Sequence, residues 1–506
     1  MDGYALRLTA KILPIRAGKP VAMVNADTAR ELGVMPLDRI EITNPESKKR
    51  MIAIVDIAKK FVSSSEIGLF EELCEELKID EKKVLYVRAA ERPQSVDYIK
   101  KKILGISLNE KEIKTIVDDI DQNRLSDIEA GAFISAVYVH GYNMAETIAM
   151  TKAMIEKSNC IKFEISPIVD KHSIGGTNGR ATMIIVPIVA AAGLYIPKTS
   201  SRSITSAAGT ADSMEVLANV CLSAEEIKEI TEDIGGVIAW GGALNLVPVD
   251  EKIIKIEYPL SLNPQGQIIA SVLAKKATVG SQYVVIDIPI GQGLKIENKA
   301  DAEIMAGKFI EVGKKLGMHI EAVLTDGNQP SGPAFGPALE ARHAMQILEG
   351  KCFDNLAQKS CELAGVLFEV TGKAKQGKGT ELAKKILESG KALKKMKQII
   401  KAQHGSILHS DEIELAKYKA SIISKKDGAI ARIDIRRLTS IARFAGAPYD
   451  KKAGVLLCVS VGDRVKKGTK LYEIFAENKG KLDAAIKEAM ANNGIELGQI
   501  ILKKLG

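Results

Sequence analysis

Short apolar runs alternate with helix-forming segments between about residues 161 and 425, and this alternation is the feature that most constrains the fold. Tyr283–Ile288 and His319–Leu324 have the length and composition of buried strands. Ser223 and Glu226 have the spacing of a capping box, which marks the start of a helix. Strands that alternate with helices predict a large α/β domain with a mostly parallel sheet over residues 161–425.

Two other patterns precede this domain. Residues 1–85 contain short alternating runs, which predict a small N-terminal β-barrel; the runs are Tyr4–Leu13, Val21–Val24, Arg39–Ile42 and Met51–Ile57. Residues 86–160 contain further capping boxes and apolar residues at helical spacing, which predict a helical domain; the boxes are Asn109 with Glu112, Ser126 with Glu129, and Asn143 with Glu146. We expect residues 250–280 to pack on this helical domain.

The pattern changes again over residues 426–506. Val459–Ile474 reads as a strand, a tight turn and a second strand, and it resembles the hammerhead of lipoyl-type domains. No lysine lies in the context of a modified lysine, so we interpret this part as a structural C-terminal α+β domain. The predicted fold class is therefore a multidomain α/β protein.

Composition narrows the classes of function. The longest apolar stretch, Met183–Leu194, contains Pro187 and is shorter than the ~20 residues that a membrane span needs, so we expect no membrane segment. The six cysteines form no Cys-x-x-Cys pair and no zinc-ligand pattern, which favours reduced thiols in a cytoplasmic protein. The net charge of +8 leaves nucleic-acid binding as one hypothesis, although only 4% of residues are aromatic. It equally suits an enzyme that attracts anionic substrates.

A glycine-rich segment, Lys171–Gly179, carries the first indication of chemistry and reads KHSIGGTNG. Its glycines allow backbone amides to approach an anion closely, while Lys171 and Ser173 add a charge and a hydroxyl donor. An apolar run follows and predicts a helix, whose N-terminus favours anions. The segment lacks the Gly-Lys-Ser/Thr ending of a P-loop, which disfavours a nucleotide triphosphatase.

A hydroxyl-rich segment, Thr199–Asp212, is the second indication and reads TSSRSITSAAGTAD. It follows the predicted strand Leu194–Ile196, and seven of its fourteen residues carry a hydroxyl group. Arg202 among these hydroxyls can engage a phosphate with two parallel hydrogen bonds. Two such segments after predicted strands indicate a shared phosphate site, although each alone could be an ordinary turn or surface loop.

Together these segments carry a family resemblance. The order Lys-His-Ser-x-Gly-Gly, an apolar helix, Ile-Pro-x-x-Ser-x-Arg and Gly-Thr-x-Asp resembles the thymidine/pyrimidine-nucleoside phosphorylase family. Ala270–Lys276, Asn328–Pro330 and Ala338–Glu340 match it as well. The N-terminal extension and the run Ser200–Ser206 resemble the archaeal-type AMP phosphorylases over essentially the whole chain.

This resemblance implies that inorganic phosphate attacks C1′ of a nucleoside 5′-monophosphate (AMP, or also CMP or UMP), and that free base and ribose 1,5-bisphosphate form. It assigns the attacking phosphate to Lys171, Ser173, Thr182, Ser200 and Thr210. It assigns the nucleotide to Gly175, Ser201, Arg202, Ser203, Ile204, Thr205, Ser206, Thr210, Ser271, Lys275 and Lys295. Ser203, Thr205 and Ser206 replace a loop of the nucleoside enzymes, and their hydroxyls suit the 5′-phosphate of a nucleotide.

One position departs from the family. An aspartate acts there as proton donor to the leaving base, whereas this chain has Asn263 in the stretch YPLSLNP. A carboxamide donates hydrogen bonds but delivers no proton at ordinary pH. Another group, with His172 and Lys275 as candidates, or water could protonate the base; a slower reaction or a different base preference are the other interpretations.

The resemblance also implies a reaction with phosphate as co-substrate and with no metal or organic cofactor. It implies small-molecule substrates without nucleic-acid or membrane partners, and a homo-oligomer built from dimers into a larger assembly. Two alternatives remain open, a pyrimidine-nucleoside phosphorylase and a basic nucleic-acid-binding protein.

Overall fold

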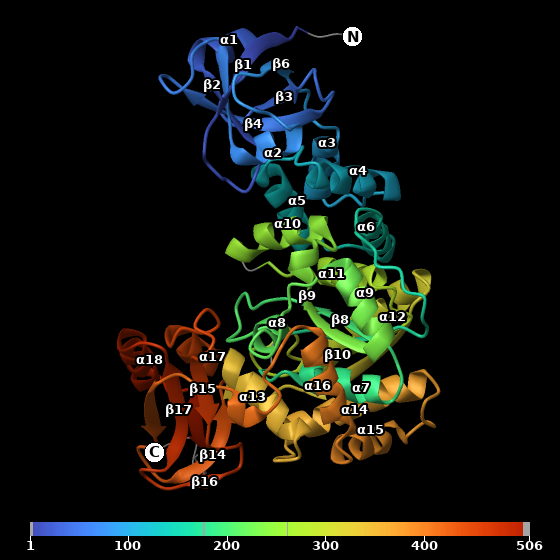
Figure 1. Ribbon diagram of the computed structural model, residues 1–506, viewed down its shortest axis with the longest axis vertical. Helices are drawn as coiled ribbons and strands as arrows, with labels where there is room; N and C mark the ends of the chain where they lie inside the picture. The colour runs from blue at the N-terminus through green and yellow to red at the C-terminus, as the bar shows by residue number, and fades with distance from the viewer. Residues whose placement is uncertain (1–3, 176–177, 261, 499–506) are drawn as a thin grey trace, which may run out of the picture. The chain divides into compact units, whose positions relative to one another are not determined.

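The computed structural model describes residues 4–175, 178–260 and 262–498. The chain forms two compact units. The first contains Met1–Lys157 and Val247–Ser271, and the second contains Ser158–Leu246 and Val272–Gly506 (Figure 1). The first unit combines the first two regions of the sequence with residues 247–271, and the second combines the rest of the third region with the fourth. The four-domain division stays a prediction.

The first unit begins with a closed barrel in the strand order β1-β5-β2-β4-β3-β6. Its strands are β1 Leu6–Ile12, β2 Val21–Asn25, β3 Arg39–Thr43, β4 Arg50–Ala58, β5 Glu66–Leu69 and β6 Val84–Ala89. Two short helices, α1 Ala26–Leu32 and α2 Glu71–Leu77, pack beside the barrel core. The predicted N-terminal barrel is therefore confirmed. Every strand contributes buried apolar residues to its core.

Helices make up the rest of the first unit: α3 Ser95–Ile103, α4 Glu110–Asp121, α5 Asp127–His140, α6 Met144–Glu156 and α10 Pro248–Glu257, followed by the start of α11 Gln265–Thr278. Asn109, Ser126 and Asn143 cap three of these helices, and each box is closed by a glutamate as predicted. Glu146 also accepts a hydrogen bond from the buried ammonium of Lys102 at 2.8 Å, which ties α6 to α3.

A parallel sheet lies at the centre of the second unit. The strands β11 His319–Asp326, β10 Tyr283–Ile290 and β7 Val169–Ser173 pair in parallel in this order. A parallel bridge between Ile168 and Tyr195 continues the sheet towards β8 Ile196–Ser200, which pairs in parallel with β9 Gly236–Trp240. The predicted mostly parallel sheet is therefore confirmed. The strand predicted at Leu194–Ile196 is displaced along the chain, because β8 begins at Ile196 and ends at Ser200.

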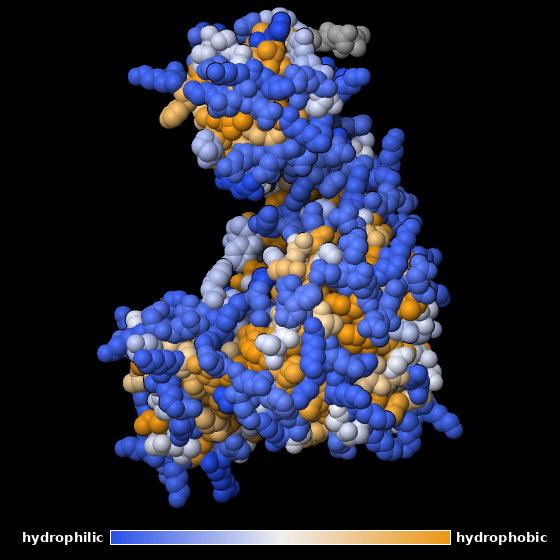
Figure 2. Space-filling view, viewed as in Figure 1, coloured by the Kyte–Doolittle hydropathy of each residue, from blue (hydrophilic) through white to orange (hydrophobic). Residues whose placement is uncertain are grey.

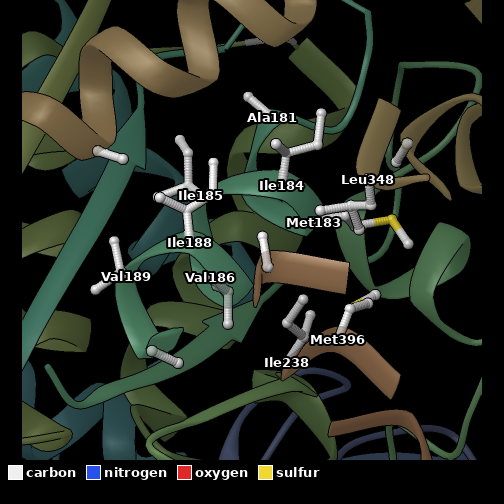
Figure 3. Packing of buried hydrophobic residues seen from close by; sticks show 14 of the residues in the cluster. Ala181, Met183, Ile184, Ile185, Val186, Ile188, Val189, Ile238, Leu348 and Met396 are labelled. Atoms are coloured by element: carbon white, nitrogen blue, oxygen red, sulfur yellow. The ribbon is translucent and has the colours of Figure 1, made fainter. Parts of the chain in front are cut away.

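Helices cover this sheet, and α7 Ala181–Ala191 is the apolar centre of their packing. Every residue of α7 from Ala181 to Ala190 is buried, and Ile184, Ile185 and Ile188 contact neighbouring side chains from several elements (Figure 3). The other helices are α8 Thr210–Met214, α9 Ala224–Ile234, α12 Lys299–Lys315, α13 Pro337–Leu348, α14 Asn355–Val370, α15 Gly379–Glu388 and α16 Lys391–Ala402. Because α7 begins directly after the glycine-rich segment, its burial fixes where that segment lies.

The C-terminal part of the second unit is built from antiparallel strands and two helices. It contains β13 Tyr418–Ile423, β14 Gly428–Ile433, α17 Ile435–Phe444, β15 Gly454–Leu457, β16 Arg464–Val465, β17 Lys470–Ala476, α18 Lys479–Ala491 and β18 Ile495–Gly498. The strand β12 Ala334–Phe335 from the α/β part pairs antiparallel with β15. This pairing joins the α/β part and the C-terminal part into one unit.

On the face shown in Figure 2, hydrophilic residues cover most of the surface, with hydrophobic residues in small groups between them. Among the described residues, no helix combines the length and the apolar composition that crossing a membrane requires.

Candidate active site

A buried carboxylate within β10, that of Asp287, lies beside the carboxyl end of β7 and contacts both neighbouring strands. The register of the parallel sheet places Ser173 of β7 opposite Asp287 of β10. Ser173 Oγ donates a hydrogen bond to Asp287 Oδ2 at 2.5 Å, and Thr325 Oγ1 of β11 donates one to Asp287 Oδ1 at 2.6 Å. Two ammonium groups complete the cluster, with the partly buried Lys359 Nζ of α14 at 3.1 Å and the buried Lys171 Nζ at 3.8 Å from Asp287 Oδ2. Lys171 also donates a hydrogen bond to Ser173 Oγ.

The pKa values of Asp287 and Lys171 are each shifted by burial and by the charge of the other group. Burial by itself raises the pKa of Asp287, but the charges of Lys171 and Lys359 and the two hydroxyl hydrogen bonds outweigh it, so the pKa lies below its usual value. Burial lowers the pKa of Lys171 to about 8, against the opposing effect of Asp287. The result is a cationic, hydroxyl-bearing site, which is the chemistry that holds a phosphate.

Alternate residues of β7 point to the other face of the sheet and enter a second buried network. Asp170 accepts a hydrogen bond from Lys276 Nζ at 2.5 Å and lies 3.5 Å from Lys198 Nζ. Burial, followed by the positive charges of Lys276 and Lys198, places the pKa of His172 well below its usual value. The imidazole of His172 is therefore neutral at ordinary pH and is not poised to donate a proton.

The end of the glycine-rich segment is held by the loop before α13. The Asn178 side chain donates hydrogen bonds to the carbonyls of Gly332 and Ala334, and it accepts one from the Ser331 amide at 3.0 Å. Gly179 has φ +80°, and a Cβ there would lie 2.1 Å from the Ser331 carbonyl oxygen, so only glycine fits. The next residue, Arg180, forms a buried ion pair with Glu340 of α13. Gly176 and Thr177 lie outside the described residues.

Arg202 in the hydroxyl-rich loop is bound by two acidic side chains. Its guanidinium forms a two-pronged ion pair with Glu215 and lies 3.3 Å from Asp212. The hydrogen bond from Arg202 is the largest cause that lowers the pKa of Glu215 to about 2. Asp212 also accepts hydrogen bonds from the amides of Ser203 and Gly209, at 2.7 and 2.9 Å. The loop is thus anchored through Arg202 and Asp212.

The structure brings many of the predicted residues together within the second unit. Lys171 and Ser173 share the Asp287 cluster, and a Cβ at Gly175 would lie 3.7 Å from Cε of Lys295. The others lie on neighbouring elements: Thr182 in the first turn of α7, Ser200 at the end of β8, Ser201–Ser206 in the loop, Thr210 at the start of α8 and Lys275 on α11. Asn263 and Ser271 belong to the first unit, just before and within α11.

Sequence reasoning did not identify the residues that support these groups. Asp287, Thr325 and Lys359 lie far along the chain from Lys171, and each looks like an ordinary strand or helix residue in the sequence. Asp287 carried one usable signal, because an acidic residue in the apolar run Tyr283–Ile290 requires a buried partner.

Comparisons with known proteins agree with this architecture. The helical bundle domain of a glycosyl transferase family matches residues 96–158, and the α/β domain of a glycosyl transferase family matches residues 165–393. The pyrimidine nucleoside phosphorylase C-terminal domain matches residues 429–496. The solved anthranilate phosphoribosyltransferase of Thermus thermophilus has a similar fold, with a TM-score of 0.53 and 21% identity over 61% of this chain and 100% of its own.

Curated relatives extend the likeness to the whole chain. The AMP phosphorylase of Methanococcus aeolicus is 44% identical over 99% of both chains. The AMP phosphorylase 1 of Archaeoglobus fulgidus is 44% identical over 98% of both chains. The protein therefore belongs to the glycosyl transferase family defined by these domains, within its AMP phosphorylase branch.

The Asp287 cluster leads to a first prediction. Asp287→Asn removes the charge that compensates Lys171 and Lys359, and breaking one partner of a buried charge pair costs about 3–5 kcal/mol. We expect a lower melting temperature of the full chain in calorimetry. Glu303→Gln on α12 is the control, since that side chain is 60% exposed, and it should leave melting unchanged. A wild-type melting temperature for Asp287→Asn would contradict this account of the cluster.

Proposed function

We propose that this protein is a pentosyltransferase that cleaves nucleoside 5′-monophosphates with inorganic phosphate, and that AMP is its principal substrate. The products are free base and ribose 1,5-bisphosphate. The observation that carries the proposal is the buried Lys171–Ser173–Asp287 cluster at the carboxyl edge of the sheet, in a chain 43–44% identical to AMP phosphorylases along its whole length. Ligands of open parallel sheets bind at this edge.

The cluster suits the attacking phosphate. The Lys171 ammonium offsets the charge that otherwise repels a phosphate from an anionic nucleotide. Ser173 Oγ donates its proton to Asp287 and accepts a hydrogen bond from this ammonium, which holds it in place. A phosphate oxygen donates an electron pair to C1′ as the bond from C1′ to the base nitrogen breaks, and that nitrogen takes the bonding pair and a proton. We propose Thr182, Ser200 and Thr210 as further phosphate contacts, and the scheme calls for no metal or organic cofactor.

Neither His172 nor Asn263 is a good source of the proton that the leaving base needs. Neutral His172 offers hydrogen bonds but holds no spare proton, since burial and neighbouring lysines keep its pKa low. Asn263 replaces the acidic residue of the family. We propose that water delivers the proton while Asn263 orients the base through its carboxamide.

A pyrimidine-nucleoside phosphorylase is the second candidate, because the C-terminal domain that matches residues 429–496 is named for that activity. The two candidates differ in whether the substrate carries a 5′-phosphate. Ser203, Thr205 and Ser206 lie in the loop that we propose for the nucleotide, beside positively charged side chains of the C-terminal part. Positive charge beside this loop favours a nucleotide, which carries a 5′-phosphate, over a nucleoside.

We further propose that the protein assembles into homo-oligomers. Exposed apolar side chains gather where the end of α5 meets the end of α3: Ile103, Leu104, Ile106, Tyr138 and Val139. His140 lies 3.1 Å from the carbonyl oxygen of Ile103 and joins the two segments. Contiguous exposed apolar surface marks an interaction site, and a second copy of the chain is its proposed partner. Light scattering on the full chain measures the assembly size.

Substrate choice tests the central proposal. With phosphate present, the protein should release adenine from AMP with a kcat/KM at least about tenfold above that for adenosine, since a bound 5′-phosphate adds charge-assisted hydrogen bonds. The measurement is chromatography of free base from AMP, CMP, UMP and the matching nucleosides. Equal kcat/KM values for AMP and adenosine would rule out nucleotide selectivity.

The charge of Lys171 predicts a pH dependence. Its pKa is about 8, so the group is cationic below that pH and becomes neutral as the pH rises through it. We expect kcat/KM for phosphate to fall about tenfold per pH unit above about 8, because this parameter reports groups of the free enzyme. In Lys171→Arg the guanidinium stays charged, so any remaining activity should lack this descending limb. The same limb in Lys171→Arg would assign it to another group.

Asn263→Asp tests the missing acid. General-acid assistance is typically worth about 10²–10⁴-fold, so a carboxyl group at this position should raise kcat for AMP at mildly acidic pH. Asn263→Leu, which offers neither a proton nor a hydrogen bond, is the matched control and should show no gain. An unchanged kcat for Asn263→Asp would mean that protonation of the base does not limit the reaction in this protein.

A further inference from the structure

Arg202, the arginine of the loop Ser201–Ser206, is already bound by acidic side chains of the protein. Arg202 forms a two-pronged ion pair with Glu215, contacts Asp212 at 3.3 Å and stacks 4.5 Å from the centre of the Trp240 ring. The carboxylates of Glu215 and Asp212 occupy three N–H donors of this guanidinium and offset its charge, so it attracts a further anion only weakly. Arg202 therefore supports the loop and leaves the 5′-phosphate of a nucleotide without a cation from the loop itself.

The two serines of the loop are also engaged. Ser203 Oγ donates to the Ser206 carbonyl at 2.5 Å, and Ser206 Oγ donates to the Ala208 carbonyl at 2.8 Å. These bonds close the loop on itself. Thr205 differs, because it lines a cavity of about 390 Å³ whose other walls come from the C-terminal part of the chain.

One face of α17 forms these walls. Arg436, Thr439, Ser440, Arg443 and Phe444 line the cavity with Thr205. Residues spaced three, four and seven apart share a helix face, and the opposite face of α17 is buried through Leu438, Ile441 and Ala442. The core thus fixes the rotation of α17 and directs both arginines towards the loop.

Arg443 is held directly against the loop. Its Nη1 donates hydrogen bonds to the carbonyls of Ile204 and Ser206, at 3.2 and 3.1 Å, on either side of Thr205. A guanidinium has five N–H donors, so others remain for a ligand. Arg436 makes no hydrogen bond or ion pair with any residue that the structure describes, and a Cβ at Gly293 would lie 3.5 Å from its Nε. Gly293 precedes Lys295 by two residues, and Lys295 extends to Gly175.

The cavity therefore lies between Thr205 of the loop Ser201–Ser206 and α17. Two guanidinium groups and three hydroxyl groups line it, and no carboxylate is among its lining residues in the described part of the chain. A second cavity of about 470 Å³ on the loop is lined by Arg202 and Lys451 but also by Asp212 and Glu215, so its charges balance. Of these two cavities, the first has the excess positive charge that a phosphate dianion requires.

We propose that Arg436 and Arg443, with Thr205, bind the 5′-phosphate of the nucleotide and so select nucleotides over nucleosides. This inference rests on the proposed function, and it assigns the recognition of the phosphate to the C-terminal part of the chain. Arg443 both orders the loop and contacts the phosphate. Arg436 contacts the phosphate but makes no hydrogen bond to the loop. Its substitution therefore tests the phosphate contact without removing a bond that orders the loop.

The test uses the full chain and the variants Arg436→Gln and Thr205→Val. Isothermal titration in the absence of phosphate measures the Kd of AMP, ribose 5-phosphate and adenosine. A hydrogen bond to a charged group is worth about 10- to 100-fold in affinity, so Arg436→Gln should raise the Kd of AMP and ribose 5-phosphate by that factor. The Kd of adenosine should not change, since adenosine lacks the phosphate. Thr205→Val should act in the same direction with a smaller factor.

Arg432→Gln is the matched control, because Arg432 lies on β14 in the same part of the chain and pairs with Glu496 at 2.9 Å. It should leave all three Kd values and the melting temperature unchanged. Equal Kd values of AMP for wild type and Arg436→Gln would overturn the subsite, even if the wild type releases adenine from AMP. If the wild type releases no base but Arg436→Gln weakens binding of ribose 5-phosphate, the subsite stands and the proposed function falls.

Discussion

The carboxylate of Asp287 is the group on which the rest of the site depends. It is buried within β10 and accepts hydrogen bonds from β7 and β11, and it offsets the charges of Lys171 and Lys359. Two ammonium groups in a low-dielectric interior repel each other unless an anion lies between them. The parallel register that places Ser173 opposite Asp287 therefore also determines where a cationic site can exist.

The elements that could be predicted from sequence are those with local signals. The capping boxes at Asn109, Ser126, Asn143 and Ser223 begin helices as expected, because the side-chain and backbone groups involved are three residues apart. That Lys171 and Ser173 lie close together was predictable for a similar reason, since they are two residues apart in one short segment; their role as phosphate ligands stays a prediction. Asp287 and Lys359 could not be predicted, because their contacts form only when strands and helices that are distant in the sequence pack together.

Arg202 illustrates the limit of reasoning from composition. A hydroxyl-rich loop with an arginine suggested a phosphate ligand, but the acids that bind this arginine lie 10 and 13 residues further along the chain. They also bind Lys451 of the C-terminal part, with Nζ 3.1 Å from Asp212 and 2.8 Å from Glu215. Asp212 is buried in α8 and Glu215 follows the last residue of that helix, so the packing of α8 places both acids. The loop sequence alone holds no information about that packing.

The loop Ser201–Ser206 thus separates two environments of different charge. On one side, Arg202 and Lys451 are neutralised by Asp212 and Glu215, which fixes the loop to α8 and to the C-terminal part. On the other side, Arg436 and Arg443 of α17 face Thr205 without a neutralising acid among the described residues of the cavity lining. A loop anchored by balanced charges can present its opposite face to an anion without rearranging, so little free energy is lost in ordering it when the ligand binds. This division of charge is the physical basis of the 5′-phosphate recognition that we propose for the C-terminal part of the chain.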